Sequence, residues 1–232
     1  MVGIKTTDFH KTQRMGSALM LLQCYWEEGG EFLDRIVSGD ETWVQFMNAE
    51  TKEQSKQWMH THSPNKPKKF KRTLLNKKMM ATAFWDRKGI LLTEFMAPGT
   101  TITSEVYCET LNKLRRSIQN KRGGMLTKGF VLLHNNMQPH TAAHTNASIK
   151  FFNWEIFYHP PYSPDPMPSD YHLFTKMKVW LATQHFHTNE ELMDGANNWL
   201  HNLAAPFFDK GLQKLVSRYD KSLNVDGNCV EK

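Results

Sequence analysis

The spacing of apolar side chains along the chain predicts an ordered series of helices and strands. Residues 7–25 repeat apolar side chains at near-helical spacing and are expected to form a helix, with Asp8 as its N-cap. Short apolar and β-branched runs predict strands, at 32–37, 42–47, 79–85, 90–96, 130–133 and 155–158. Helical periodicity predicts the later helices, at 103–120, 141–152, 169–184, 189–203 and 206–223. This order predicts an α/β domain with a mixed sheet, in which hairpins come first and βαβ crossovers follow.

Three polar residues fall at the ends of these predicted elements. A tight turn at 38–41 places Asp40 after the first strand, Asn135 follows the strand 130–133, and Asp170 begins the helix after the last strand. Strand ends can meet at one edge of a sheet although they are distant in sequence. Carboxylates gathered there would hold Mg²⁺, and a pair of such ions activates a water or a 3′-hydroxyl at a phosphodiester. Spacing alone is a weak signal, because polar residues at strand ends are common in α/β proteins.

A long polar segment, residues 48–78, separates two of the predicted strands. Its basic residues cluster, with Trp58 and Phe70 interleaved, at Lys66, Lys68, Lys69, Lys71, Arg72, Lys77 and Lys78. Neutralisation of phosphates combined with an aromatic stacking surface is typical of contacts with the DNA backbone. A solvated loop without a partner is the alternative interpretation of the same composition.

Composition and charge restrict the class of protein. The hydrophobic content of 40% excludes a wholly disordered chain, and no run approaches the roughly 18 apolar residues of a membrane span. Three scattered cysteines argue against a disulfide framework and favour a reducing compartment. A net charge of +6 permits a polyanionic partner without requiring one.

Three sequence blocks carry a resemblance to a known family. They read SGDETW at 38–43, HNNMQPH at 134–140 and HPPYSPDPMPSDY at 159–171, and 34 residues separate Asn135 from Asp170. The wording, order and spacing of these blocks resemble the three catalytic blocks of mariner-type (Tc1/mariner) DNA transposases. The resemblance runs over the whole chain.

The resemblance implies a fold, a reaction and a site. The implied fold is RNase H-like (retroviral-integrase-like), with a mixed five-stranded sheet flanked by helices. The implied reaction is cut-and-paste DNA transposition with two ions of Mg²⁺ or Mn²⁺, held at the positions of Asp40, Asn135 and Asp170. It also implies a nuclear protein whose partner is DNA, with neither a membrane nor a small-molecule substrate.

One catalytic position departs from the family pattern. The second block of the family reads His-Asp-Asn-Ala-Arg-Pro-His, so Asn135 stands where the family has its second catalytic Asp. An amide oxygen carries no charge and cannot bridge two ions as a carboxylate does. We therefore expect strongly impaired or absent cleavage. Because Met137 and Gln138 depart in the same block, drift or domestication explains the change better than a designed substitution.

The resemblance also predicts the organisation of the chain. Residues 1–31 are expected to be a helical lead-in derived from an interdomain linker, and 32–232 the catalytic domain. In this alignment, 48–78 is a clamp-like insertion that reaches a partner subunit and DNA in a homodimer. Family members carry helix-turn-helix modules that read transposon ends, and their absence here predicts loss of sequence-specific end recognition.

Several assignments stay open at this point. His140 is predicted either to contact a DNA phosphate or to serve packing beside Asn135. A weakly active Mn²⁺-dependent nuclease could use Asp40 and Asp170 with Glu41 as a substitute ligand. A binding module that has lost catalysis could retain DNA contacts or dimerisation alone.

Overall fold

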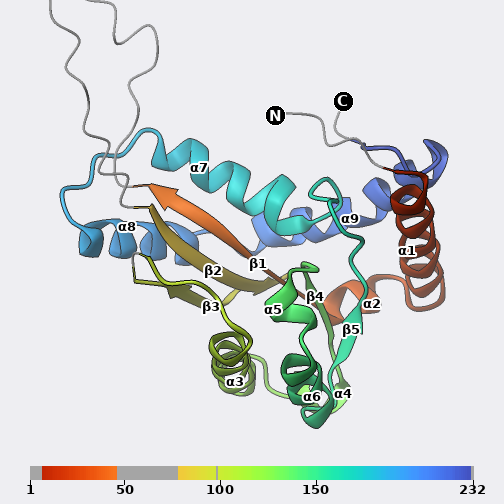
Figure 1. Cartoon of the computed structure of the whole chain (residues 1–232), viewed down its shortest axis with the longest axis horizontal. Coiled ribbons are helices and arrows are strands. Elements are labelled where there is room, and N and C mark those ends of the chain that lie inside the picture. Colours follow the sequence, from red (N-terminus) through yellow and green to blue (C-terminus); the bar gives the residue numbers. More distant parts are fainter. Residues whose placement is uncertain (1–6, 46–77, 98, 231–232) are drawn as a thin grey trace, which may run out of the picture.

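A five-stranded mixed sheet forms the centre of the molecule (Figure 1). The computed structural model describes residues 7–45, 78–97 and 99–230. The strands lie in the order β3-β2-β1-β4-β5, with the bounds β1 (Ile36–Gln45), β2 (Lys78–Asp86), β3 (Gly89–Phe95), β4 (Val131–His134) and β5 (Glu155–Phe157). Strands β1, β2 and β3 pair antiparallel, whereas β4 pairs parallel with both β1 and β5. The predicted mixed sheet, with hairpins before crossovers, is confirmed.

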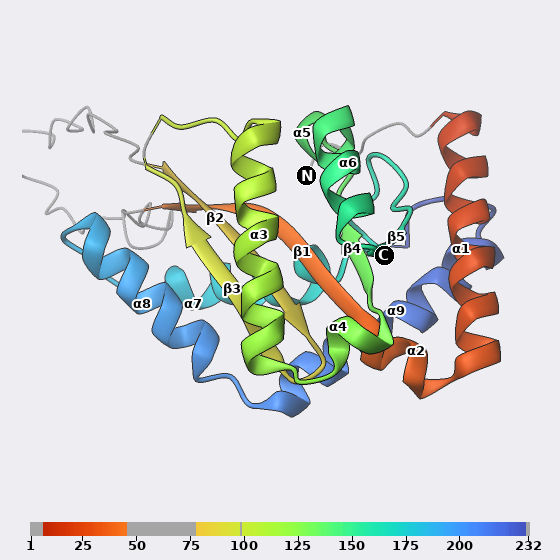
Figure 2. The ribbon, with the colours of Figure 1, turned by 90° about the horizontal axis from the view of Figure 1, so that it is seen from below.

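Helices cover both faces of this sheet (Figures 1 and 2). One face carries α3 (Ser104–Lys121), α4 (Met125–Lys128), α5 (Gln138–Thr141) and α6 (Ala143–Phe151). The other carries the π-helical segment η1 (Ser169–Phe174), α7 (Thr175–Leu181), α8 (Asn189–His201) and α9 (Ala205–Asn224). Helices α1 (Asp8–Glu28) and α2 (Gly30–Arg35) precede the sheet, and α1 packs against α9. None of the helices in the described ranges is both long enough and apolar enough to span a bilayer.

Each face of the sheet buries its own hydrophobic core. Val37, Phe84 and Leu111 belong to the core under α3, whereas Ile36 and Trp85 belong to the core under α7 to α9. This division follows from strand geometry, since successive side chains point to opposite faces. Burial of each large apolar side chain contributes about 1.5–3 kcal/mol to folding. The same alternation along β1 sends Asp40 and Glu41 toward opposite faces.

The strand predicted at 32–37 and the turn predicted at 38–41 are wrong, whereas the strand predicted at 42–47 is the second half of β1 as far as Gln45. Phe32 and Leu33 are buried in helix α2, and β1 then runs without interruption from Ile36 to Gln45. Gly39 does not make a turn: it pairs with Phe84 in β2, and a Cβ at Gly39 would lie 2.1 Å from Cε1 of that ring. The glycine is needed for close approach of an aromatic ring, a use that resembles a turn signal in sequence. Asp40 therefore lies within a strand.

Two smaller expectations also need correction. The helix predicted at 141–152 is two helices, α5 and α6, divided at Ala142, which has the extended backbone angles φ −60° and ψ 150°. Helix α1 is capped by Thr7 rather than Asp8, because the Thr7 hydroxyl accepts from the backbone N–H of His10 at 3.3 Å. In these two regions the presence of helix was predicted correctly and only its boundaries were not.

A buried ion pair joins three distant parts of the chain. Nη1 and Nη2 of Arg14 in α1 donate to the two carboxylate oxygens of Asp165 at 2.7 and 2.5 Å, and both residues are at most 2% exposed. Arg14 Nε donates to the carbonyl oxygen of Gly227, and Val230 N–H donates to Asp165. Helix α1, the segment before η1 and the C-terminal segment are therefore held together by one charged contact.

We expect Arg14→Met to lower the free energy of unfolding by about 3–5 kcal/mol, because Asp165 would stay buried without its counter-charge. Arg14→Met/Asp165→Leu should recover part of the loss, since it removes the remaining charge. Urea unfolding of the variants measures both effects.

The matched control is Arg35→Met, which removes an arginine whose partners Glu28 and Glu155 are exposed. Its cost should be about 1 kcal/mol or less. Equal losses in the Arg14 and Arg35 variants would show that the buried pair has no special role.

Candidate metal and catalytic site

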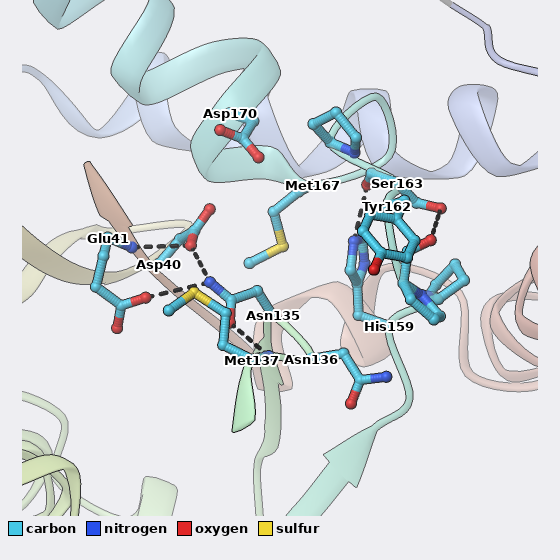
Figure 3. Close-up of a pocket in the computed structure, with 13 residues that line it drawn as sticks. Asp40, Glu41, Asn135, Asn136, Met137, His159, Tyr162, Ser163, Met167 and Asp170 are labelled. Atoms are coloured by element: carbon cyan, nitrogen blue, oxygen red, sulfur yellow. Dashed lines mark hydrogen bonds between the residues drawn. The ribbon is translucent and has the colours of Figure 1, made fainter. Parts of the chain in front are cut away.

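The three residues singled out from the sequence lie together where the short strand β4 ends, beside the middle of β1. Asp40 lies in β1, Asn135 directly follows β4, and Asp170 lies in η1. All three line a cavity of about 440 Å³ together with Glu41 and the proline-rich turn (residues 159–168) (Figure 3). Figure 3 shows the Asp170 carboxylate pointing toward that of Asp40 from the opposite side of the cavity.

The length of β4 accounts for this meeting. Strand β4 pairs with β1 only from Ile36 to Gly39, and the last pair joins Gly39 to His134. The next residue along each strand is Asp40 in β1 and Asn135 after β4. Parallel pairing thus places them side by side, although 95 positions separate them in sequence.

Asn135 uses its amide to bind both neighbouring carboxylates. Its Nδ2 donates to Asp40 Oδ1 at 2.6 Å and to Glu41 Oε2 at 3.1 Å. Its Oδ1 accepts from the backbone N–H of Met137 at 3.2 Å. The side chain therefore presents a hydrogen-bond donor to the acidic groups, and its oxygen faces the backbone after β4.

The electrostatics of Asp40 reflect crowded negative charge. Burial raises the pKa of Asp40 well above its usual range, and the carboxylates of Asp170 and Glu41 raise it further. Hydrogen bonds from the Glu41 N–H and from Asn135 oppose this rise but do not cancel it. The protein alone therefore holds Asp40 in a setting that disfavours its charged form.

The neighbours of Asp170 anchor the start of η1. Ser169 Oγ accepts from Trp85 Nε1 at 3.1 Å and lies 3.3 Å from Ser38 Oγ in β1. On the other side of Asp170, the Tyr171 hydroxyl donates to the carbonyl of Gly211 at 2.8 Å. These contacts fix η1 against the sheet and α9. They therefore fix the backbone position of Asp170.

Behind Asn135, three rings form a buried stack. His140 lies against Tyr107 with ring centroids 3.9 Å apart, and against His134 at 5.3 Å. His140 Nδ1 lies 3.2 Å from the carbonyl oxygen of Asn135, and its Nε2 lies 3.2 Å from a Glu41 carboxylate oxygen. Because His140 is only 1% exposed, the packing role is favoured over the predicted phosphate contact. Sequence reasoning missed Tyr107, whose position on a helix gave no signal beyond that of a core residue.

The proline-rich turn contains another buried histidine. His159 lies with Nε2 2.8 Å from the carbonyl oxygen of Ser163, and burial lowers the pKa of His159 to about 4. Tyr162 in this turn has a positive φ of 54° and is 63% exposed at the cavity. Backbone strain of this kind persists only where surrounding contacts enforce it.

The predicted DNA-contacting basic residues are not placed by the structure. Lys66, Lys68, Lys69, Lys71, Arg72 and Lys77 lie outside the described residues, as does most of the predicted insertion 48–78. Only its last residue, Lys78, enters a described element, at the start of β2.

Comparison with known proteins identifies the relatives of this chain. Residues 48–128 match a family described as "Transposase (partial DDE domain)". The human protein "Histone-lysine N-methyltransferase SETMAR" is 33% identical over 202 residues, which is 86% of this chain and 29% of that protein. "Mariner Mos1 transposase" of Drosophila mauritiana is 32% identical over 225 residues, which is 94% of this chain and 62% of that protein. The chain thus spans less than two thirds of the length of either curated relative.

A solved structure decides the family. The catalytic domain of Mos1 mariner transposase superposes with a TM-score of 0.83 at 30% identity, and the alignment covers 100% of both chains. The chain belongs to the mariner transposase family. The sheet order and the helices on both faces are those of its RNase H-like catalytic domain, so the predicted fold is confirmed. Other similar Mos1 structures include ones with Mn and with Mg, and a paired-end complex with the left transposon end.

The donor set of this mariner catalytic domain does not fit two metal ions. Members of the family use divalent metals, whose hard cations prefer oxygen ligands. Across the described ranges, no three His, Cys, Asp or Glu side chains are grouped to hold an ion. Asn135 also directs Nδ2, and not an oxygen, at Asp40. The residues that remain suited to a cation are the carboxylates of Asp40 and Asp170.

We expect stability to fall as the pH drops from about 6.5 to about 4, partly because of His159. The pKa of His159 is about 4 in the fold, against an ordinary value of 6.5, so the unfolded chain binds more protons in this range. Each such histidine contributes a slope of roughly 1.4 kcal/mol per pH unit. His159→Gln retains an N–H donor for Ser163. This variant should lower the slope of unfolding free energy against pH, measured by urea unfolding, by about the contribution of one proton. An unchanged slope would show that His159 is already charged in the fold.

Proposed function

We propose that this mariner catalytic domain derives from a transposase that cleaves and joins DNA strands, and that its own cleavage is strongly impaired. The observation that carries the proposal is the hydrogen bond from Asn135 Nδ2 to Asp40 Oδ1 at 2.6 Å. A donor bonded to this carboxylate occupies one of the lone-pair directions that a cation would need.

Rotation of the Asn135 amide would turn Oδ1 toward a metal ion, but at a cost in free energy. The rotated Oδ1 would face the carboxylates of Asp40 and Glu41, and both hydrogen bonds from Nδ2 would be lost. A hydrogen bond to a charged group contributes about 1.5–3 kcal/mol. The rotated amide would also bring no negative charge. Cation binding at Asp40 and Asp170 therefore competes with a network that the protein satisfies internally.

Glu41 is poorly placed to substitute for the missing carboxylate. It follows Asp40 in β1 and points to the other face of the sheet, where its side chain is 5% exposed beside His140. One of its carboxylate oxygens accepts from Asn135, and the other lies near His140 Nε2. A weak Mn²⁺-dependent nuclease built on Glu41 is therefore less well supported than loss of cleavage.

The relatives support DNA as the partner. Similar Mos1 structures are described as a pre-cleavage transpososome, a strand transfer complex and paired-end complexes. We extend this to the present chain as binding of DNA in the nucleus, by a homodimer that forms through residues 48–78. Catalytic decay leaves such binding possible, because contacts with the DNA backbone do not need the metal ligands.

We expect Asn135→Asp to restore Mn²⁺-dependent nicking of a supercoiled plasmid, while the unchanged chain stays near background. The substitution returns the third carboxylate and its charge to the position beside Asp40. Mutation of single catalytic groups commonly changes rates by about two orders of magnitude or more.

The matched control is Asn135→Asp/Asp170→Asn, in which nicking should disappear again. It distinguishes restored chemistry from a contaminating nuclease. Robust nicking by the unchanged chain would overturn the proposal of impaired cleavage.

We expect Asn135→Asp to destabilise the protein in EDTA by about 1–3 kcal/mol at neutral pH, because the two hydrogen bonds from Nδ2 are lost and like charges are brought together. Excess Mn²⁺ should reverse the loss in the variant and change the unfolding of the unchanged chain far less. Urea unfolding with and without Mn²⁺ measures this difference. Equal stabilisation of both proteins by Mn²⁺ would show that Asn135 does not weaken metal binding.

A further inference from the structure

A second cavity lies at the opposite end of the sheet from Asp40 and Asn135. It measures about 540 Å³ and lies among α2, the β2–β3 turn, the end of α3 and α4. We call it the lysine pocket, because its lining includes Lys88, Lys121 and Lys128. Figure 2 shows α2 and α4 close together at the end of the molecule remote from α5, which follows Asn135. The pocket therefore shares no lining residue with the candidate metal site.

The two arginines of the pocket already have acidic partners. Arg122 binds both oxygens of Asp86, at 2.6 and 2.9 Å, and this aspartate is 1% exposed. Arg35 forms ion pairs with Glu28 and Glu155. These two positive charges are therefore neutralised within the protein.

The three lysines lack such partners. No ion pair within the described residues involves Lys88 or Lys128, and both side chains are exposed. Nζ of Lys121 donates to the carbonyl oxygens of Leu91 at 2.8 Å and Ile90 at 3.4 Å, which are uncharged.

Acidic residues do not balance these lysines. Two acidic residues line the pocket, Glu31 and Asp34. Asp34 forms an ion pair with Arg87, whereas Glu31 forms none within the described residues. The pocket is therefore a hollow with an excess of positive charge.

The pKa of Lys121 is consistent with an excess of positive charge in the pocket. Partial burial lowers the pKa of Lys121, the nearby charge of Arg122 lowers it further, and the charge of Asp86 offsets only part of this. A bound anion would relieve this repulsion. The backbone of Gly123, Gly124 and Gly129 also lines the pocket, and residues without a Cβ allow close approach of a ligand.

We propose that the lysine pocket binds a phosphate group of the DNA backbone. Lys88 in the β2–β3 turn, Lys128 in α4 and Lys121 at the end of α3 all line the pocket, so three positive charges are available to one phosphate. Lysine recognises phosphate as a point charge, so the contact is independent of base sequence. The inference rests on the proposed function only in taking DNA as the partner, since the pocket is separate from the residues of cleavage.

Binding of a labelled DNA duplex, measured by fluorescence anisotropy in EDTA over a range of NaCl concentrations, tests the pocket without any metal chemistry. Lys88→Ala/Lys128→Ala should reduce the magnitude of the slope of log affinity against log salt by about 1, because one neutralised phosphate contributes about 0.9. The control Lys178→Ala/Lys214→Ala removes two exposed lysines from α7 and α9 and should leave the slope nearly unchanged. Equal slopes for the two double variants would overturn the proposal.

Lysine acetylation followed by mass spectrometry gives a readout for each residue on the unchanged chain. Bound duplex should protect Lys88 and Lys128 several-fold more than Lys178 and Lys214. Equal protection of all four lysines would overturn the proposal. So would duplex binding without protection of Lys88 and Lys128. Failure of the unchanged chain to bind any duplex would overturn DNA as the partner as well. Neither result depends on the nicking assay, so the cleavage proposal stands or falls separately.

Discussion

The ion pair between Arg14 and Asp165 is the contact on which the geometry of the candidate site depends. Asp165 lies in the proline-rich turn, five residues before Asp170, and its charge is buried. Burial alone would raise the pKa of Asp165, but the hydrogen bonds and charge of Arg14, with the N–H of Val230, lower it overall. The aspartate is therefore held in its charged form, which keeps the turn fixed to α1 and to the C-terminal segment.

The segment after Asp165 is in turn fixed to the sheet and to α9. The turn leads into η1, where Ser169 and Tyr171 fasten the chain to Trp85 and Gly211. Asp170 is thereby brought to the side of β1 on which Asp40 lies. The ion pair thus helps to hold Asp170 beside Asp40, because Asp165 belongs to the turn that lines the cavity and leads into η1.

Asn135 changes what those carboxylates can do. In a site built for cations, repulsion between neighbouring acids is relieved when metal binds. Here, part of that relief comes from Nδ2 of Asn135, which bridges Asp40 and Glu41. The chain therefore keeps the fold of a mariner catalytic domain while its acidic cluster is held together by a side-chain amide.

The sequence by itself determined the family, the mixed sheet, most of the helices and the three site positions, because local periodicity and short motifs encode them. The turn that the sequence predicted at Gly39 is wrong. Phe84, which packs on that glycine, is 45 positions away, so the contact leaves no local signal in the sequence. Only the tertiary structure decided that the Asn135 amide directs its donor at Asp40, that Tyr107 and His140 stack behind it, and that Arg14 is buried with Asp165. Each of these depends on contacts between distant segments, and the orientation of a polar side chain is set by the partners that the fold brings to it.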